Sequence, residues 1–284
     1  MNAVSEGSPG NAEDALVERI LGIVRDRTGT DFTLYRPPTT RRRIGNRMIS
    51  VGIARVADYL AYLEENEDEV RALVGRLTIK VSRFYRNAAT FDHLRTCVIP
   101  ELARGGAPLQ LWSAGCGRGE EAYTLAMLLA DAGVEGTVHA TDIDPEALEQ
   151  AAAATYGADA LDDLPCELAA RYLEPVRHAA DPRYRVSEAV RRRVSFSRRD
   201  ITNDGPPTAG ATCDLVAFRN VAIYLRREAH ESVFARLLAA LRPGGYLCLG
   251  EAEWPPAAVE ARLQCAARKL RLFRAHGGIA AEAA

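Results

Sequence analysis

The chain has 284 residues, of which 48% are hydrophobic, and its formal net charge at pH 7 is −2. This length is enough for one large domain and a smaller one, each with its own apolar core. A charge so close to zero gives the whole molecule no broad attraction to nucleic acid or to an anionic membrane. The sequence also lacks a basic stripe interleaved with aromatic residues, so we expect no nucleic-acid partner.

The cysteines and the hydropathy pattern indicate a reduced, cytoplasmic protein. The six cysteines are scattered without a C-x-x-C pair, so we expect no structural zinc and no other metal. No apolar run reaches the roughly 18 residues that span a bilayer, which predicts no insertion into a membrane. Residues 1–12 are small and polar, and we expect them to be disordered.

From residue 13 to about residue 95 the apolar residues recur at helical spacing, which predicts a small all-helical domain. Within it, the Pro37-Pro38 pair ends an extended stretch. Thr39 and Thr40 then offer hydroxyl groups as N-caps for a helix over 41–51.

That helix opens with a run of basic residues, which are Arg41, Arg42, Arg43 and, one turn later, Arg47. Residues at i and i+4 lie on one face of a helix, so Arg43 and Arg47 should project together. A solvated charge face is the common explanation of such a run, and a functional face is the alternative. The sequence alone does not separate the two.

From residue 96 to residue 276 short β-rich runs alternate with longer helical ones, which predicts an α/β domain with a mostly parallel, Rossmann-like sheet. We expect strands at 109–113, 137–141, 194–197, 213–218 and 246–250. We expect helices at 120–132, 145–154, 163–172 and 228–240. Residues 177–193 are dense in charge and form either a loop or a small β insert, and residues 277–284 should be flexible.

A glycine-rich loop joins the first of these strands to the helix that follows it. Gly115, Gly117 and Gly119 come directly after the strand, and the helix begins at Glu120. Glycines in this place let the backbone turn tightly and approach a ligand without a Cβ in the way. A purely structural turn is possible, but the strand-loop-helix context favours a nucleotide-like cofactor over the loop.

The second strand ends in an acidic residue, Asp142. An acid at this point, about 20 residues beyond the glycine loop, is where such folds hydrogen-bond the ribose hydroxyls of a cofactor. Asp142 could instead cap the next helix, but Asp144 immediately before Pro145 fits that role better. We therefore expect Asp142 to bind ribose.

Two later segments favour S-adenosylmethionine over a dinucleotide. Residues 241–247 (LRPGGYL) join a helix to a strand, and together with 214–217 (DLVA) they resemble the closing motifs of class I methyltransferases. The loop also has the G-x-G-x-G spacing of those enzymes and an acidic pair after it, instead of the G-x-G-x-x-G of nicotinamide-binding proteins.

Four segments together resemble a narrower family, the CheR chemotaxis methyltransferases. They are residues 77–86 (LTIKVSRFYR), 112–123 (WSAGCGRGEEAY), 141–144 (TDID) and 218–225 (FRNVAIYL). The resemblance covers about residues 14–275. It implies an N-terminal helical domain, a class I methyltransferase sheet with a small β subdomain, and the esterification of glutamate side chains on the cytoplasmic helical region of a chemoreceptor. The cofactor would be S-adenosylmethionine and its product S-adenosylhomocysteine.

The resemblance also implies roles for individual residues. Arg86 and Tyr224 would orient the incoming carboxylate, although by themselves they would be interpreted as a structural ion pair and a buried ring. The implied cofactor contacts are Lys80, Ser82, Arg86, Gly115, Gly117, Glu120, Glu121, Asp142, Asp200, Ile201, Arg219 and Asn220. The implied receptor-docking residues are Arg41, Arg42, Arg43 and Arg47, and the β insert would bind a receptor tail.

The chain departs from the family at several of these places. The family usually has Asn at Lys80, Thr at Ser82 and Asn at Asp200, and it has Gly-His-Ser-Glu where this chain has Gly-Glu-Ala-Glu at 250–253. Two alternatives stay open, the first of which is favoured by the departures at Lys80 and Glu251. One is a CheR-like enzyme with another protein or a small molecule as substrate, and the other is a non-catalytic signalling module that binds the cofactor.

Overall fold

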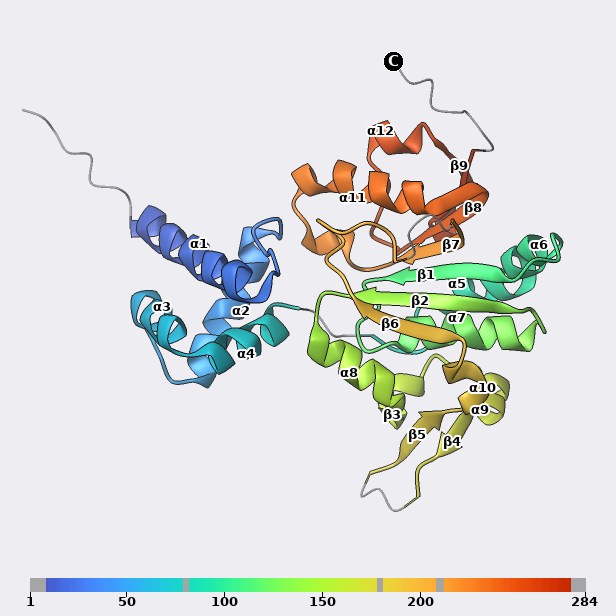
Figure 1. Cartoon of the computed structure of the whole chain (residues 1–284), viewed down its shortest axis with the longest axis horizontal. Helices are drawn as coiled ribbons and strands as arrows, with labels where there is room; N and C mark the ends of the chain where they lie inside the picture. Colours follow the sequence, from blue (N-terminus) through green and yellow to red (C-terminus); the bar gives the residue numbers. More distant parts are fainter. Residues whose placement is uncertain (1–8, 79–81, 178–180, 208–211, 277–284) are drawn as a thin grey trace, which may run out of the picture. The chain divides into compact units, whose positions relative to one another are not determined.

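The computed structural model describes residues 9–78, 82–177, 181–207 and 212–276. The chain divides into two compact units (Figure 1). The first consists of residues 1–79 and 224–226, and the second consists of residues 80–223 and 227–284. No helix in the described ranges is long and apolar enough to cross a membrane.

The first unit is all-helical, as predicted. Its helices are α1 (Pro9–Thr28), α2 (Pro37–Ser50), α3 (Val56–Glu65) and α4 (Glu67–Leu77). They bury an apolar core that includes Ile20, Val24, Leu63 and Leu73. Helix α1 begins at Pro9, inside the stretch that we expected to be disordered, whereas residues 1–8 lie outside the described residues.

The predicted start of α2 was wrong. The helix begins at Pro37, so Thr39 and Thr40 lie inside its first turn and do not cap it. Proline is well suited to the first helical positions because it has no N–H to satisfy there and its φ angle is already helical. The Thr40 hydroxyl donates to the carbonyl of Pro37 at 3.1 Å.

Residues 224–226 leave the second unit and pair with the first. The N–H of Arg36 donates to the carbonyl of Tyr224 at 2.9 Å, and the N–H of Arg226 donates to the carbonyl of Leu34 at 2.8 Å. Tyr35 and Leu225 form an isolated antiparallel bridge between these bonds. The chain therefore connects the two units at this point as well as at residues 79–80.

The boundary between the units lies at residue 79, not after residue 95 as the periodicity suggested. Helix α5 (Ala88–His93), the π-helix η1 (Leu94–Val98) and α6 (Ile99–Ala103) all belong to the second unit. Phe91 and Leu94 are buried in the core that packs against its sheet. Helical periodicity continues across this boundary, so it cannot mark where one core ends and another begins.

The second unit is built on a sheet of seven strands in the order β6-β2-β1-β7-β8-β10-β9, which confirms the predicted Rossmann-like class. The strands are β1 (Leu109–Ala114), β2 (Gly136–Asp142), β6 (Val194–Arg198), β7 (Cys213–Phe218), β8 (Leu241–Leu249), β9 (Leu263–Ala267) and β10 (Leu272–Ala275). The first five of these are parallel, whereas β10 is antiparallel to both β8 and β9.

Helices cover both faces of the sheet. Figure 1 shows α7 (Glu120–Asp131) and α8 (Pro145–Ala153) on one side and α11 (Arg227–Ala240) on the other. Because β1, β2 and β7 are parallel and adjacent, their carboxyl ends meet at one edge. The loops at 115–119, 142–144 and 219–223 therefore emerge together, at the edge where open α/β sheets bind ligands.

Part of the charged stretch at 177–193 forms a strand of a small β element, which agrees with the second of the two alternatives. A separate antiparallel sheet has the order β3-β5-β4. It takes β5 (Arg183–Val186) from this stretch but draws β3 (Thr155–Gly157) and β4 (Leu173–Pro175) from earlier in the chain. The other short elements are η2 (Ala158–Leu161), α9 (Cys166–Tyr172), α10 (Glu188–Arg191), η3 (Ala222–Tyr224), α12 (Ala257–Glu260) and η4 (Arg268–Leu270). Residues 277–284 lie outside the described residues.

Candidate active site

The glycine loop between β1 and α7 is anchored at its start and open at its centre. The N–H groups of Gly115 and Cys116 donate to the carbonyl of Thr141 at 2.7 and 2.9 Å, which ties the loop to β2. Gly115 has φ +76, and a Cβ there would lie 2.5 Å from Cγ2 of Val221. Gly117 has φ +55, and a Cβ there would meet no atom within 4 Å. The backbone at Gly117 thus faces free space, as a cofactor cradle requires.

Asp142 closes this cradle from the end of β2. Its Oδ2 accepts a hydrogen bond from the Gly117 N–H at 2.8 Å, and its Oδ1 accepts one from the Asp144 N–H at 2.9 Å. Burial raises the pKa of Asp142, and these two N–H groups oppose that shift. Each carboxylate oxygen can accept a second hydrogen bond, so the pair can still bind two neighbouring hydroxyls. These residues fit an adenosyl cofactor.

The alternative role of Asp142 as a helix cap does not hold. Asp144 is the N-cap of α8, and its Oδ1 accepts from the N–H groups of Glu146 and Ala147 at 3.0 and 3.3 Å. Asp144 caps the helix, as predicted. The Asp142 carboxylate therefore binds the glycine loop and remains available to a ligand.

The two acidic residues at the start of α7 have different surroundings. The Glu121 carboxylate accepts from the hydroxyl of Ser113 at 2.7 Å and forms an ion pair with Arg219 at 3.2 Å. Glu120 is fully buried and forms an ion pair with Arg118 at 3.2 Å. The contact with Arg118 lacks hydrogen-bond geometry, so within the described part of the chain neither carboxylate oxygen of Glu120 accepts a well-directed hydrogen bond. Burial raises the pKa of Glu120.

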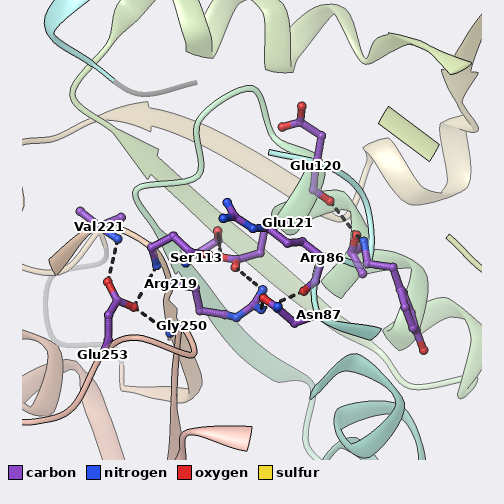
Figure 2. Close-up of polar contacts among 12 residues, drawn as sticks. Arg86, Asn87, Ser113, Glu120, Glu121, Arg219, Val221, Gly250 and Glu253 are labelled. Carbon is purple, nitrogen blue, oxygen red and sulfur yellow. Dashed lines mark hydrogen bonds and ion pairs between the residues drawn. The ribbon is translucent and has the colours of Figure 1, made fainter. Parts of the chain in front are cut away.

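Arg219, at the end of β7, is enclosed by protein groups (Figure 2). One guanidinium nitrogen, Nη2, donates to the carbonyl of Arg86 at 2.8 Å and to Oδ1 of Asn87 at 2.7 Å. The guanidinium also lies over the ring of Phe91, with 4.9 Å between Cζ and the ring centre. Together with its ion pair to Glu121, these contacts give Arg219 a structural role in fixing the segment that carries Arg86. A contact with the cofactor stays a prediction.

Asn220, the next residue, has a left-handed backbone with φ +61. The N–H groups of Asn220 and Val221 both donate to the buried carboxylate of Glu253, at 2.9 and 2.8 Å. The sequence analysis missed Glu253 and also Ser113. The only signal for Glu253 in the sequence is its place as the glutamate that ends the Gly-Glu-Ala-Glu segment, which corresponds to the glutamate of the family's Gly-His-Ser-Glu segment.

The other predicted cofactor residues are less informative. Asp200 is buried, and its carboxylate accepts from the N–H and the hydroxyl of Thr202 at 2.9 and 2.6 Å, so it shapes the turn after β6. Ile201 and Ser82 are partly buried. Lys80 lies outside the described residues. Tyr224 belongs by its contacts to the first unit, so its role in methyl transfer stays a prediction.

Arg47, one of the four predicted docking residues, is part of the packing of the first unit. Its Nε and Nη2 donate to the two carboxylate oxygens of Glu69 at 2.8 and 2.5 Å, and the Tyr59 hydroxyl donates to the same carboxylate at 2.7 Å. Against the effect of burial, these donors hold the pKa of Glu69 below its usual value. Arg47 therefore stabilises the contact between α2 and α4.

The other three basic residues of α2 differ in their exposure. Arg41 and Arg42 are exposed, and Arg41 forms an ion pair with Asp14 of α1. Arg43 is partly buried and donates to the carbonyls of Arg76 and Thr78 at 2.7 and 3.0 Å, at the end of α4. Docking of a partner by this helix stays a prediction.

Comparison with known proteins agrees with this geometry. Residues 80–269 match the family described as "CheR methyltransferase, SAM binding domain", and residues 15–78 match "CheR methyltransferase, all-alpha domain". The first match confirms the predicted cofactor, S-adenosylmethionine, for this domain.

Three relatives illustrate the similarity. An "Uncharacterized 104.1 kDa protein in hypE 3'region" of Rhodobacter capsulatus is 36% identical over 83% of this chain and 25% of its own length. A "Probable biofilm formation methyltransferase WspC" of Pseudomonas putida is 31% identical over 83% of this chain and 56% of its own length. A "Chemotaxis protein methyltransferase" of Listeria monocytogenes is 29% identical over 81% of this chain and 87% of its own length. The chain thus spans about a quarter of the length of the first relative and little more than half of the length of the second. It belongs to the CheR methyltransferase family.

Proposed function

We propose that this protein transfers the methyl group of S-adenosylmethionine to glutamate side chains of a chemoreceptor or receptor-like protein, with S-adenosylhomocysteine as the other product. The observation that carries the proposal is the meeting of the open glycine loop, Asp142 and Asn220 at one edge of the sheet, in a domain of the CheR family. The names of the Listeria and Pseudomonas relatives support a role in chemotaxis adaptation or related signalling.

In methyl transfer to a carboxylate, the main task of the protein is to position the two reactants. When bound, the cofactor supplies a methyl group on a positively charged sulfur, which is already activated for transfer. A glutamate side chain has a pKa of about 4.3 and is ionised at neutral pH, so the nucleophile needs no general base. Holding two reactants in line at near-contact distance can supply roughly 7–11 kcal/mol of a barrier.

In this scheme the residues divide into two groups. The backbone of the glycine loop and Asp142 hold the adenosyl part, and Asn220 contacts the methionine part. Arg86 and Tyr224 orient the incoming carboxylate. A cation that bound the carboxylate too tightly would reduce its reactivity, so we assign Arg86 to orientation and not to tight binding.

For the protein partner we propose the cytoplasmic helical region of the receptor. The exposed guanidinium groups of Arg41 and Arg42 suit an acidic helix, whereas Arg43 and Arg47 are engaged mainly within the helical unit and would act by holding α2 in place. The small β sheet around β5 is proposed as the site of a receptor tail, by analogy with the family. This assignment places the activity in the cytoplasm.

The proposal is tested by incubating the protein with methyl-labelled S-adenosylmethionine and membranes of the organism that encodes it. Mild base then releases any methyl ester as volatile methanol. We expect label on a membrane protein band, released by base and lost with the Asp142→Asn variant. Base-stable label would indicate a different acceptor group. Binding of the cofactor without any labelled product would indicate a non-catalytic module.

A further inference from the structure

Glu253, in the loop after β8, is a buried carboxylate that binds backbone groups of the neighbouring loop (Figure 2). Only 3% of the residue is exposed. Its Oε2 accepts from the N–H groups of Asn220 and Gly250 at 2.9 and 2.7 Å, and its Oε1 accepts from the N–H of Val221 at 2.8 Å. One side chain therefore satisfies three backbone donors in two loops.

Packing alone does not account for a carboxylate in this place. Removing a carboxylate from water is costly unless hydrogen bonds compensate for the loss of solvation. Hydrogen bonds from N–H groups to a charged oxygen are shorter and stronger than those to a neutral one. The two oxygens of Glu253 also bind consecutive N–H groups, at residues 220 and 221, so they fix the orientation of the peptide between them.

The peptide between Asn220 and Val221, which Glu253 holds, lies against the glycine loop. Asn220 has a left-handed backbone, a conformation that asparagine adopts more readily than other non-glycine residues. Val221 approaches Gly115 so closely that a Cβ on Gly115 would lie 2.5 Å from Cγ2 of Val221. At Gly250, a Cβ would lie 2.7 Å from Oε2 of Glu253 and 2.8 Å from the nitrogen of Asn220. The loop that holds Asn220 and Val221 is thus in close contact with the glycine loop on one hand and with the loop after β8 on the other.

We propose that Glu253 is a positioning residue for the cofactor site: its carboxylate holds the 220–221 peptide in the conformation that presents Asn220 to the cofactor and seats Val221 against Gly115. Glu253 would act through Asn220 and would not itself touch the reactants. The inference rests on the proposed function to the extent that it treats Asn220 as a cofactor residue.

The loop that carries Glu253 is also held by contacts of its neighbouring residues, Trp254 and Glu251. The guanidinium groups of Arg268 and Arg271 both lie over the ring of Trp254, with Cζ at 4.9 and 5.0 Å from the ring centre, and this ring packs edge-on against Phe273 at 4.9 Å. Arg271 also donates to the carbonyl of Glu251 at 2.8 Å. These contacts fix the loop against residues 268–273. A fixed loop is expected if the position of Glu253 matters to the residues that it binds.

A double-mutant cycle on S-adenosylhomocysteine binding tests the proposal, with affinity measured by calorimetry. In Glu253→Gln, one acceptor oxygen becomes an NH₂ group that faces a backbone donor. We expect this variant to bind about 10- to 100-fold more weakly, the range seen when a residue that supports a metal ligand is removed. The matched control is Glu251→Gln, which neutralises an exposed carboxylate two residues away and should bind as wild type.

The cycle is completed with Asn220→Ala, alone and combined with Glu253→Gln. If Glu253 acts through Asn220, the glutamine substitution should cost little further affinity in the alanine background. A loss of the same size in both backgrounds, or unchanged binding by Glu253→Gln, would overturn the proposal. Glu253→Asp, which keeps the charge but shortens its reach, serves for the same cycle if the glutamine variant folds poorly. A wild-type chain that does not bind S-adenosylhomocysteine would instead refute the proposed function.

Discussion

Replacing Gly115 with alanine should destabilise the fold more than the same change at Gly117 or Gly133. All three glycines have left-handed backbones, with φ of +76, +55 and +65. An alanine in this conformation costs about 1–2 kcal/mol at each position. Only Gly115 has a close neighbour, because its Cβ would lie 2.5 Å from Cγ2 of Val221, whereas the other two would meet nothing within 4 Å. Such overpacking adds about 1–3 kcal/mol.

The free energy of unfolding of the three variants, measured in urea, separates the cost of the left-handed backbone from the cost of overpacking. We expect losses of about 1–2 kcal/mol for Gly117→Ala and Gly133→Ala, and about 2–5 kcal/mol for Gly115→Ala. Calorimetry with S-adenosylhomocysteine adds a second test, since the methyl group at position 117 enters the space in front of the loop. Gly117→Ala should lose affinity and Gly133→Ala should keep it. A Gly115→Ala protein as stable as Gly133→Ala would refute the inferred contact between the loops.

Two further predictions concern buried acids and their partners. Burial raises the pKa of Glu120, so its contribution to folding is complete below its unfolded pKa and is lost as the pH rises through the folded value. Glu120→Gln should therefore raise the melting temperature by an amount that grows from acidic to alkaline pH, and a gain independent of pH would contradict this. Arg47→Ala leaves the buried carboxylate of Glu69 without its cation and should cost about 3–5 kcal/mol in urea denaturation. Arg42→Ala, at an exposed position, should change stability by less than about 0.5 kcal/mol, and equal losses would argue against the structural role of Arg47.

Structural features that depend on residues close together in the sequence could be predicted. The apolar strand, the glycines and the helix start at Glu120 lie next to one another in the chain, so their geometry follows from local backbone preferences. The same is true of Asp142 at the end of β2 and of the cap formed by Asp144 before Pro145. These elements place the cofactor loop without knowledge of distant contacts.

Features that depend on distant partners could not be predicted in this way. The role of Glu253 comes from its hydrogen bonds with the N–H groups of residues 220 and 221, which lie in the loop after the adjacent strand β7. The residues next to Glu253 in the sequence do not indicate these bonds. The charge of Arg47 suggested a surface residue, because its partner Glu69 lies on another helix. The start of α2 at Pro37 is a local signal, but the hydroxyls of Thr39 and Thr40 compete with it as candidate caps, so the sequence pattern favours a later start than the observed one.

The central claim is that the glycine loop and Asp142 form the cofactor site, and a titration of S-adenosylhomocysteine into the wild-type protein and Asp142→Asn tests it most directly. In the variant one carboxylate oxygen becomes an NH₂ group, so either the Gly117 or the Asp144 N–H loses its acceptor, and that position can no longer accept from a ribose hydroxyl. We predict one binding site per wild-type chain and an affinity lower by about tenfold or more in the variant. Equal affinity in the two proteins would contradict the account.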